Sequence, residues 1–225
     1  MVAARMTSLQ QTIEARLVEY FLRLDETMLH FGNAPISVLA IACTGSSYQL
    51  GPAREDELFS SLHTRLGIPV TNSALAVVAA LKSLGTRRIG LVSPYPRSLT
   101  EQSVAYWTAR GLEVVAVAAT ETLPDTAFHP IYAMSASMTD AAIGKLESTS
   151  GLEAVVLLGT GTPTLGAILR RPRVGCAPVF SCNMALAWHS VALLSSTQAT
   201  QSSVLIEMIS GVCWREDFLR RQGSA

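Results

Sequence analysis

The stretch ISVLAIACTGSS, residues 36–47, contains an apolar run that ends in a thiol, three hydroxyls and a glycine. The run is short, continuous and bounded by Pro35 and by Cys-Thr-Gly, which predicts a buried strand over residues 36–42. Cys43 would then lie at a strand-to-helix turn, where backbone N–H groups stabilise a thiolate. Cys43 is therefore a candidate nucleophile, although a buried and inert cysteine fits the same pattern.

The alternation of apolar strand and helix continues to residue 194. Helical periodicity runs from Thr7 to about His30, with Thr7 or Ser8 as the N-cap, and Ser98 with Glu101 form a predicted capping box. Strands that are apolar on both faces and alternate with helices predict the α/β class, with a parallel sheet covered on both sides. Further helices are predicted over residues 53–67, 73–85, 98–111, 138–148 and 183–194 and after Pro163, and further strands over 68–70, 87–93, 112–119, 153–159 and 177–181.

Two segments of the first half recur in the second half in the same order. VLAIACTGS (38–46) is similar to AVVLLGTGT (154–162), and IPVTNSALAV (68–77) is similar to APVFSCNMALAW (177–188). This echo predicts two related α/β lobes, residues 1–112 and 113–195, followed by a polar linker and a helical tail over 196–225. Because ligands bind beyond the carboxyl ends of parallel strands, the loops that begin at Cys43 and Gly159 would face one cleft.

The composition narrows the possible functions. The 225 residues carry 17 basic and 17 acidic side chains without a basic cluster, which disfavours a nucleic-acid partner. No apolar run is long enough to span a membrane and the N-terminus has no signal-peptide core, so we expect a cytoplasmic protein without membrane contact. The four cysteines have neither metal-ligand nor disulfide spacing, so we expect reduced thiols and no metal site. A hydrophobic content of 49% is compatible with a homo-oligomer.

Small polar residues at the ends of predicted strands are candidates for binding an anion. Two glycine-containing loops, a phenol and an amide offer N–H and O–H donors that suit a carboxylate or a developing enolate. Turns commonly contain these residue types, and the amide could cap a helix, so structural roles stay open. GTGTPT lacks the third glycine and the acidic residue of the dinucleotide fingerprint, which excludes a nicotinamide site. The candidates are Thr44, Gly45, Ser46, Asn72, Tyr95, Gly159, Thr160 and Gly161.

Four segments resemble the aspartate/glutamate racemase superfamily, and within it the branch of maleate cis-trans isomerases and arylmalonate decarboxylases. They are ACTGSSYQLGP (42–52), GIPVTNSALAVVAALKSLGTRRIGLVSPY (67–95), VVLLGTGTPTL (155–165) and PVFSCNMALAWHSVALL (178–194). The resemblance implies two Rossmann-like lobes related by a pseudo-twofold axis, an active site in the cleft between them, a small dicarboxylate substrate, and neither cofactor nor metal. It also implies that Thr44, Tyr95 and the amides of residues 159–161 bind a carboxylate or stabilise an enediolate.

In the isomerases that the chain resembles, one cysteine of each lobe flanks the substrate. One of them is thought to add to the double bond of maleate, which gives a covalent succinyl intermediate. Cys43 matches the first cysteine, whereas Gly159 stands at the place of the second. The decarboxylases show the reverse pattern, with glycine in the first lobe and cysteine in the second. A two-base racemisation needs a proton donor on each face, so the single matching thiol disfavours racemase activity.

Three functions stay open at the level of the sequence. The first is a cofactor-independent isomerase of a small unsaturated dicarboxylate with Cys43 as nucleophile. The second is an arylmalonate-type decarboxylase with Cys43 as proton donor to an enediolate. The family opens with a strand and a substrate-binding loop that have no counterpart before Thr7, so we expect the first lobe to lack its N-terminal strand. That departure favours the third function, a catalytically silent protein for binding or assembly.

Overall fold

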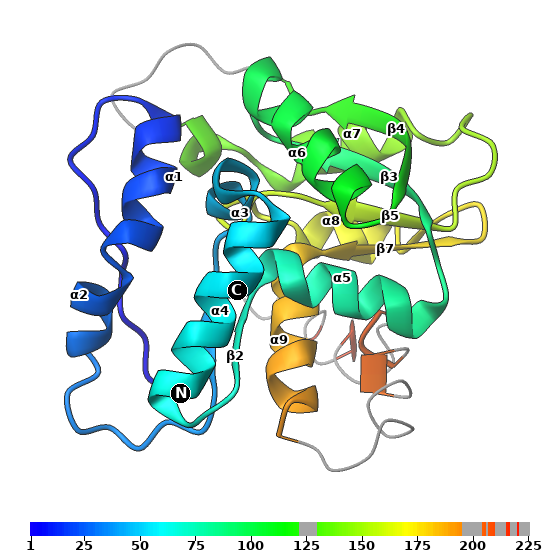
Figure 1. Cartoon of the computed structure of the whole chain (residues 1–225). Coiled ribbons are helices and arrows are strands. Elements are labelled where there is room, and N and C mark those ends of the chain that lie inside the picture. Colours follow the sequence, from blue (N-terminus) through cyan, green and yellow to red (C-terminus); the bar gives the residue numbers. More distant parts are fainter. Residues whose placement is uncertain (122–129, 195–203, 206, 210–214, 217–219, 221–225) are drawn as a thin grey trace.

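The computed structural model describes residues 1–121, 130–194, 204–205, 207–209, 215–216 and 220, and it confirms the α/β class (Figure 1). The strands are β1 (Leu39–Ile41), β2 (Val70–Asn72), β3 (Arg88–Ser93), β4 (Glu113–Ala119), β5 (Ala154–Leu157), β6 (Arg173–Val174) and β7 (Ala177–Ser181). The helices are α1 (Ile13–Leu22), α2 (Leu24–Leu29), α3 (Gly45–Leu50), α4 (Pro52–Leu66), α5 (Ser73–Leu84), α6 (Arg97–Ala109), the 3₁₀ helix η1 (Pro130–Ala133), α7 (Ala136–Gly144), α8 (Leu165–Arg170) and α9 (Cys182–Ala192).

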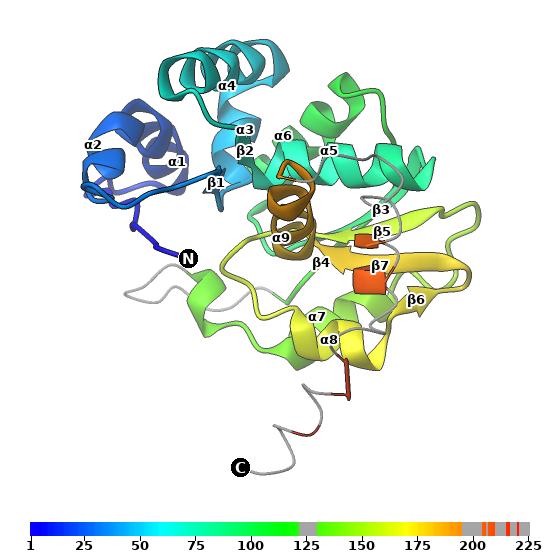
Figure 2. The ribbon, with the colours of Figure 1, turned by 90° about the horizontal axis from the view of Figure 1, so that it is seen from below.

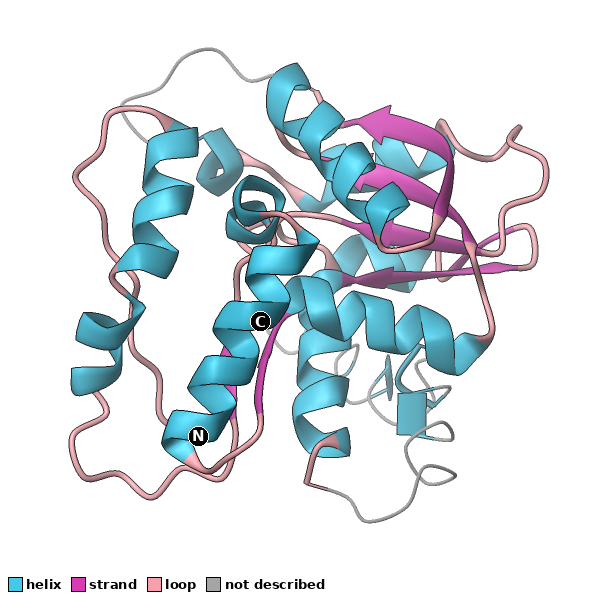
Figure 3. Cartoon of the chain, in the orientation of Figure 1, coloured by secondary structure: helices cyan, strands magenta, loops and turns pink. Residues whose placement is uncertain are grey.

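The strands form two separate sheets (Figure 3). β1 and β2 make a small parallel sheet in which Leu39 lies opposite Val70 and Ile41 opposite Asn72. The larger sheet has the order β4-β3-β5-β7-β6, and all its pairings are parallel except that of the edge strand β6 with β7. β3 and β5 lie at its centre, where both faces are covered, which explains why their apolar runs are continuous rather than alternating.

Sheet membership does not follow the predicted boundary between lobes. β3 belongs to the predicted first lobe, yet it pairs with β4 on one side and with β5 on the other. A division between residues 112 and 113 therefore separates two hydrogen-bonded strands. The chain passes from the smaller sheet to the larger one between α5 and β3. A pseudo-twofold relation between two lobes stays a prediction.

Helices cover both faces of the larger sheet (Figure 2). α5 and α6 lie on one face, and α7 and α8 lie on the other. α9 packs along α5 and contacts both β7 of the larger sheet and β1 and β2 of the smaller one. α9 thus joins the two sheets, and no described helix is both long enough and apolar enough to cross a membrane.

The prediction of one helix from Thr7 to His30 was wrong. α1 begins at Ile13, and its N-cap is Thr12, whose hydroxyl accepts a hydrogen bond from the backbone N–H of Ala15. The helix breaks at Arg23 before α2 begins. The apolar period continues across the break because both helices turn buried leucines toward the same core. Residues 1–11 contain no strand, and among the described strands β1 pairs with β2 alone.

The prediction of a capping box at Ser98 was also wrong. α6 begins at Arg97, directly after Pro96, and no side chain caps its first turn. Because the helix starts before Ser98, that serine already lies inside the first turn. Glu101 pairs with Arg97 instead, with 2.7 Å between its Oε1 and the guanidinium Nε.

Most of the predicted tail helix lies outside the described residues. Leu205 and Ile209 are buried in the main core, and Arg215 donates a hydrogen bond to the carbonyl of Leu169 at 3.2 Å. The described part of the tail therefore packs on the body of the protein.

A buried carboxylate, that of Glu55 in α4, holds several elements together. Its side chain is 0% exposed and accepts hydrogen bonds from Asn72 Nδ2 at 2.6 Å, from the Tyr106 hydroxyl and from the Arg110 guanidinium. Asn72 also donates to Ser47 Oγ of α3 at 3.3 Å. A buried charge is tolerated only when it is paired and fully hydrogen-bonded, and Glu55 meets both conditions. The network fixes α4, α6 and the start of α5 around α3.

Replacing Glu55 should therefore destabilise the fold strongly. Glu55→Ala leaves Asn72, Tyr106 and Arg110 without their common acceptor, and we expect a loss of about 3–5 kcal/mol in the free energy of unfolding. Asp56→Ala is the matched control, because Asp56 pairs with the same Arg110 at 2.8 Å but its side chain is 57% exposed. For Asp56→Ala we expect less than about 1 kcal/mol. Urea unfolding measures both, and equal losses would contradict the role assigned to Glu55.

Candidate active site

Cys43 lies between β1 and α3 and is 6% exposed. Its Sγ is 3.1 Å from Ser46 Oγ, and the backbone N–H groups of Gly45 and Ser46 also point toward the sulfur. Burial raises the pKa of the Cys43 thiol, while the Ser46 hydroxyl and the two N–H groups oppose that shift. The Ser46 hydroxyl, however, donates its proton to the carbonyl of Leu17 at 2.7 Å. It therefore accepts from the neutral thiol and stabilises a thiolate only after its proton turns to the sulfur.

Tyr95 connects the two loops that were expected to face each other. Its hydroxyl lies 2.9 Å from Thr44 Oγ1, and the backbone N–H of Gly159 is close enough to oppose the rise in its pKa. Burial raises the pKa of Tyr95 far above its ordinary value, so the phenol is neutral at physiological pH. Thr44, Tyr95 and Gly159 thus form one cluster of donors next to Cys43, and this cluster joins the smaller sheet to the larger one.

Thr160 serves as a structural link rather than as a free donor in this structure. Its hydroxyl donates to the carbonyl of Ala42 at 3.0 Å, and its own carbonyl accepts from Asn183 Nδ2 at 2.9 Å. The link ties the residue before Cys43 to the start of α9. Gly161, the third residue of this loop, is exposed.

Gly159 has no room for a side chain. Its φ is +82°, and a Cβ atom there would lie 2.5 Å from Pro94 Cγ, 2.7 Å from Thr162 Oγ1 and 2.9 Å from Ile131 Cδ1. Both the backbone conformation and these contacts require glycine. A cysteine at position 159 would therefore need a rearrangement of the loop.

The remaining predicted site residues, Gly45, Ser46 and Asn72, have packing or hydrogen-bonding roles within the protein. Asn72 is 0% exposed, and its amide is used by Glu55, Ser47 and the N–H of Leu75, for which it is the N-cap of α5. Gly45 packs under α1, since a Cβ there would lie 2.7 Å from Leu17 Cδ1. Gly45, Ser46 and Asn72 therefore hold α3 in place in this structure, and a direct contact with a ligand stays a prediction for them.

Sequence reasoning missed Cys182, the first residue of α9. Its side chain is 0% exposed, and its own N–H and that of Asn183 point toward the sulfur. Burial raises the pKa of this thiol to about 12, and the nearby Cys43 adds to the effect. The internal echo gives no signal for it, because Cys182 occupies in PVFSCNMA the place that Ser73 occupies in IPVTNSAL.

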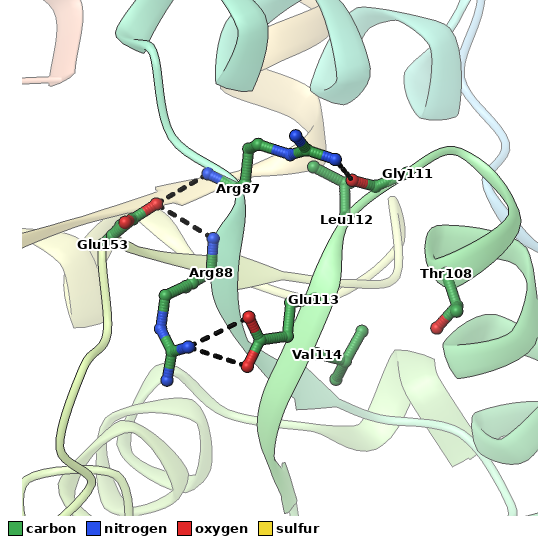
Figure 4. Close-up of a pocket in the computed structure, with 8 residues that line it drawn as sticks. All are labelled: Arg87, Arg88, Thr108, Gly111, Leu112, Glu113, Val114 and Glu153. Carbon is green, nitrogen blue, oxygen red and sulfur yellow. Dashed lines mark hydrogen bonds and ion pairs between the residues drawn. The ribbon is translucent and has the colours of Figure 1, made fainter.

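A pocket of about 700 Å³ lies at the opposite edge of the larger sheet, and its lining residues are drawn in Figure 4. It is formed at the amino ends of β3 and β4, whereas Tyr95 and Gly159 follow the carboxyl ends of β3 and β5. Its charged side chains already have hydrogen-bond partners within the protein, and Arg87 donates to the carbonyl of Gly111 at 3.2 Å. Arg88 binds Glu113 at 2.8 Å, and Glu153 accepts from the N–H groups of Arg87 and Arg88 at 2.7 and 3.0 Å. This pocket does not belong to the donor cluster, and the described residues contain no group of three side chains suited to a metal ion.

Similarity to known proteins extends over most of the chain. A family model described as arylmalonate decarboxylase matches residues 6–206. The chain is 34% identical to a maleate isomerase from Geobacillus stearothermophilus over 95 residues, which are 40% of this chain and 38% of that protein. It is 25% identical to an arylmalonate decarboxylase from Bordetella bronchiseptica over 158 residues, which are 70% of this chain and 65% of that enzyme. The aligned segments thus span less than two thirds of these curated relatives.

Solved structures of a maleate isomerase and of an arylmalonate decarboxylase share the fold. A mutant of the Nocardia farcinica maleate cis-trans isomerase with a covalently bound succinylcysteine intermediate superposes with a TM-score of 0.73 at 25% identity, covering 86% of this chain and 78% of that one. A crystal structure of arylmalonate decarboxylase superposes with a TM-score of 0.63 at 23% identity, covering 80% and 75%. Because the family model matches residues 6–206 of the 225, the chain belongs to the arylmalonate decarboxylase family.

Proposed function

We propose that this protein is a cofactor-independent isomerase of a small unsaturated dicarboxylate, with Cys43 as the nucleophile. The observation that carries the proposal is the position of the Cys43 thiol, at the start of α3 and beside the Thr44–Tyr95–Gly159 cluster. A thiolate adds to a carbon–carbon double bond that is conjugated to a carboxylate, and the charge then moves onto that carboxylate. The cluster next to Cys43 offers donors for this charge.

The donors of the cluster are fixed before a substrate arrives. Thr44 is 1% exposed, its hydroxyl is hydrogen-bonded to Tyr95, and the backbone N–H of Gly159 lies near the same phenol. A substrate carboxylate would exchange these internal bonds for bonds to its own oxygens, so little reorganisation is needed when the enediolate forms. A neutral phenol is the form of Tyr95 that can donate to such an oxygen.

The relatives support an isomerase that works through a cysteine adduct. The Nocardia farcinica enzyme is a maleate cis-trans isomerase observed with a succinylcysteine intermediate. A segment of 95 residues shared with the Geobacillus stearothermophilus maleate isomerase is 34% identical. We assign the nucleophile of this chain to Cys43 because it is the thiol that lies directly before α3.

Decarboxylation of a substituted malonate is the second candidate. The match of residues 6–206 to the arylmalonate decarboxylase family favours it. Loss of carbon dioxide would leave an enediolate held by the same donors, and a neutral Cys43 thiol would give it a proton. The raised pKa of Cys43 keeps the thiol in the form that this step requires.

The expected cytoplasmic location and homo-oligomer stay predictions.

The isomerase proposal predicts that activity depends on Cys43. We expect the protein to convert maleate to fumarate, as followed by NMR, and Cys43→Ser to reduce the rate by more than about 1000-fold because a hydroxyl is a far weaker nucleophile. Cys176→Ser is the matched control, since Cys176 is an exposed free thiol away from the cluster. Isomerisation that survives in Cys43→Ser would exclude the covalent mechanism, and carbon dioxide release from an arylmalonate without isomerisation would favour the decarboxylase.

The reactivity of Cys43 should rise at alkaline pH. Burial raises its pKa, so the thiol is neutral at pH 7 and becomes a thiolate only above the ordinary cysteine range of about 8.5. We expect the rate of alkylation of Cys43 by iodoacetamide, measured by peptide mass spectrometry, to have its midpoint above that of glutathione in the same buffers. A midpoint below about 8.5 would mean that the N–H groups of α3 outweigh burial.

Gly159 should not accept a side chain. We expect Gly159→Ala to lower the free energy of unfolding by about 1–3 kcal/mol more than Gly111→Ala. Gly111 is the matched control, because it has the same φ of +82° but a Cβ there would meet only Arg87 Nη2, at 4.0 Å. Urea unfolding of the two variants gives the difference. If both variants lost equal stability, crowding around position 159 would not explain the absence of a cysteine there.

A further inference from the structure

Cys182 is a second buried thiol, which follows a strand of the larger sheet and lies near enough to Tyr95 to raise the pKa of that phenol. Cys43 follows β1 of the smaller sheet, whereas Cys182 follows β7 of the larger one and opens α9. Each sulfur receives backbone N–H groups from the first turn of the helix that begins there. The internal echo pairs Cys43 with Gly159, but the fold brings a thiol to the cluster from a different strand end.

Hydrogen bonds tie the start of α9 to the segment before Cys43. Asn183, the residue after Cys182, donates from Nδ2 to the carbonyl of Thr160 at 2.9 Å, and Thr160 donates from Oγ1 to the carbonyl of Ala42 at 3.0 Å. Farther along α9, His189 Nδ1 lies 3.0 Å from Thr71 Oγ1 of β2. The position of Cys182 relative to Cys43 is therefore set by two contacts on either side of the cluster.

The phenol of Tyr48, which packs against Tyr95, has no hydrogen-bond partner. The Tyr48 residue is 7% exposed, and its hydroxyl makes no hydrogen bond although Thr44 lies nearby. Its ring meets that of Tyr95 edge to face, with 6.1 Å between centroids, and Tyr95 and Cys182 both raise its pKa further beyond the effect of burial. A buried donor without a partner costs free energy unless a ligand or a water completes it. The Tyr48 hydroxyl is therefore a buried donor beside Tyr95 that is open to a ligand oxygen or a water.

We propose that Cys182 carries the proton in the reaction for which Cys43 is the nucleophile. The inference rests on the proposed function, and it assigns the second thiol of that reaction to the start of α9 instead of position 159. Tyr48 would bind the carboxylate next to the carbon that receives the proton. The site would then hold two thiols, one from each sheet.

The proton and electron balance of isomerisation is complete with these two thiols. Cys43, after releasing its proton to water, forms a C–S bond to one olefinic carbon, and the π electrons move onto the other carbon and its carboxylate. The Cys182 thiol gives its proton to that carbon, which leaves a thiolate at Cys182 and a single bond that can rotate. The Cys182 thiolate then removes a proton from the same carbon, the double bond forms again and the C–S bond to Cys43 breaks.

The two thiols differ in a way that suits these roles. Burial raises the pKa of Cys182 to about 12, so it is a neutral proton donor at physiological pH. Cys43 is 6% exposed and has its sulfur at the start of α3, where two backbone N–H groups and the Ser46 hydroxyl oppose the rise of its pKa. Cys182 therefore still holds the proton that a short-lived enediolate needs, and Cys43 is the thiol better placed to lose its own.

Replacing Cys182 separates proton transfer from nucleophilic addition. We expect Cys182→Ser to lower kcat for maleate by at least about 100-fold, with KM changed less than about threefold and with alkylation of Cys43 unchanged, because serine keeps the size but is a much weaker acid. In D2O the wild-type protein should place deuterium on the vinylic carbon of fumarate, and Cys182→Ser should lose this incorporation. Cys176→Ser is the control for loss of a thiol elsewhere.

The outcomes distinguish this inference from the proposed function. If wild-type protein isomerises maleate and Cys182→Ser retains both its kcat and its deuterium incorporation, the role of Cys182 is refuted while Cys43 keeps its own. If wild-type protein turns over neither maleate nor an arylmalonate, the proposed function fails. The proton-transfer role of Cys182 then fails with it, and labelling with methyl methanethiosulfonate tests the shared site alone: maleate protects both Cys43 and Cys182 if the two thiols face one ligand, and a Cys182 that is labelled equally with and without maleate refutes that.

Discussion

The carboxylate of Glu55 is the constraint on which the described arrangement around α3 depends. It is completely buried and bound by Asn72, Tyr106 and Arg110, which come from β2 and α6. A charge in this position is stable only while all its partners stay in place, so it fixes the relative positions of those elements. Asn72 passes this constraint on to α3 through Ser47 and caps α5 through Leu75. The Glu55 network therefore also fixes α3, and with it the turn that carries Cys43.

The donor cluster sits where the two sheets meet. Thr44 comes from the smaller sheet, and Tyr95 and Gly159 follow central strands of the larger one. Parallel strands place their carboxyl ends at the same edge, and helices that start there point their N–H groups toward that edge. Both features favour negative charge, so uncharged hydroxyls and amides would suffice for the anion site that we propose there.

Much of this arrangement could be predicted from the sequence. The apolar runs around Leu91 and Val156 predicted central strands, and the echo of the Cys43 and Gly159 loops predicted that strand ends would meet. Two kinds of information were out of reach. The burial of Glu55 depends on partners far away in the chain, so its local sequence is that of an ordinary glutamate in a helix. Sheet membership of β3 depends on pairing with β5, which lies beyond β4 in sequence. Cys182 was overlooked because the matching strand end in the first half carries a serine.

The central claim is that Cys43 forms a bond to the substrate. It is tested most directly by quenching the protein with acid during turnover of maleate and mapping the adduct by peptide mass spectrometry. The account predicts a succinyl group on Cys43, formed in wild-type protein and absent from Cys43→Ser. Turnover of maleate with no succinyl adduct, or with the adduct on another residue, would contradict it.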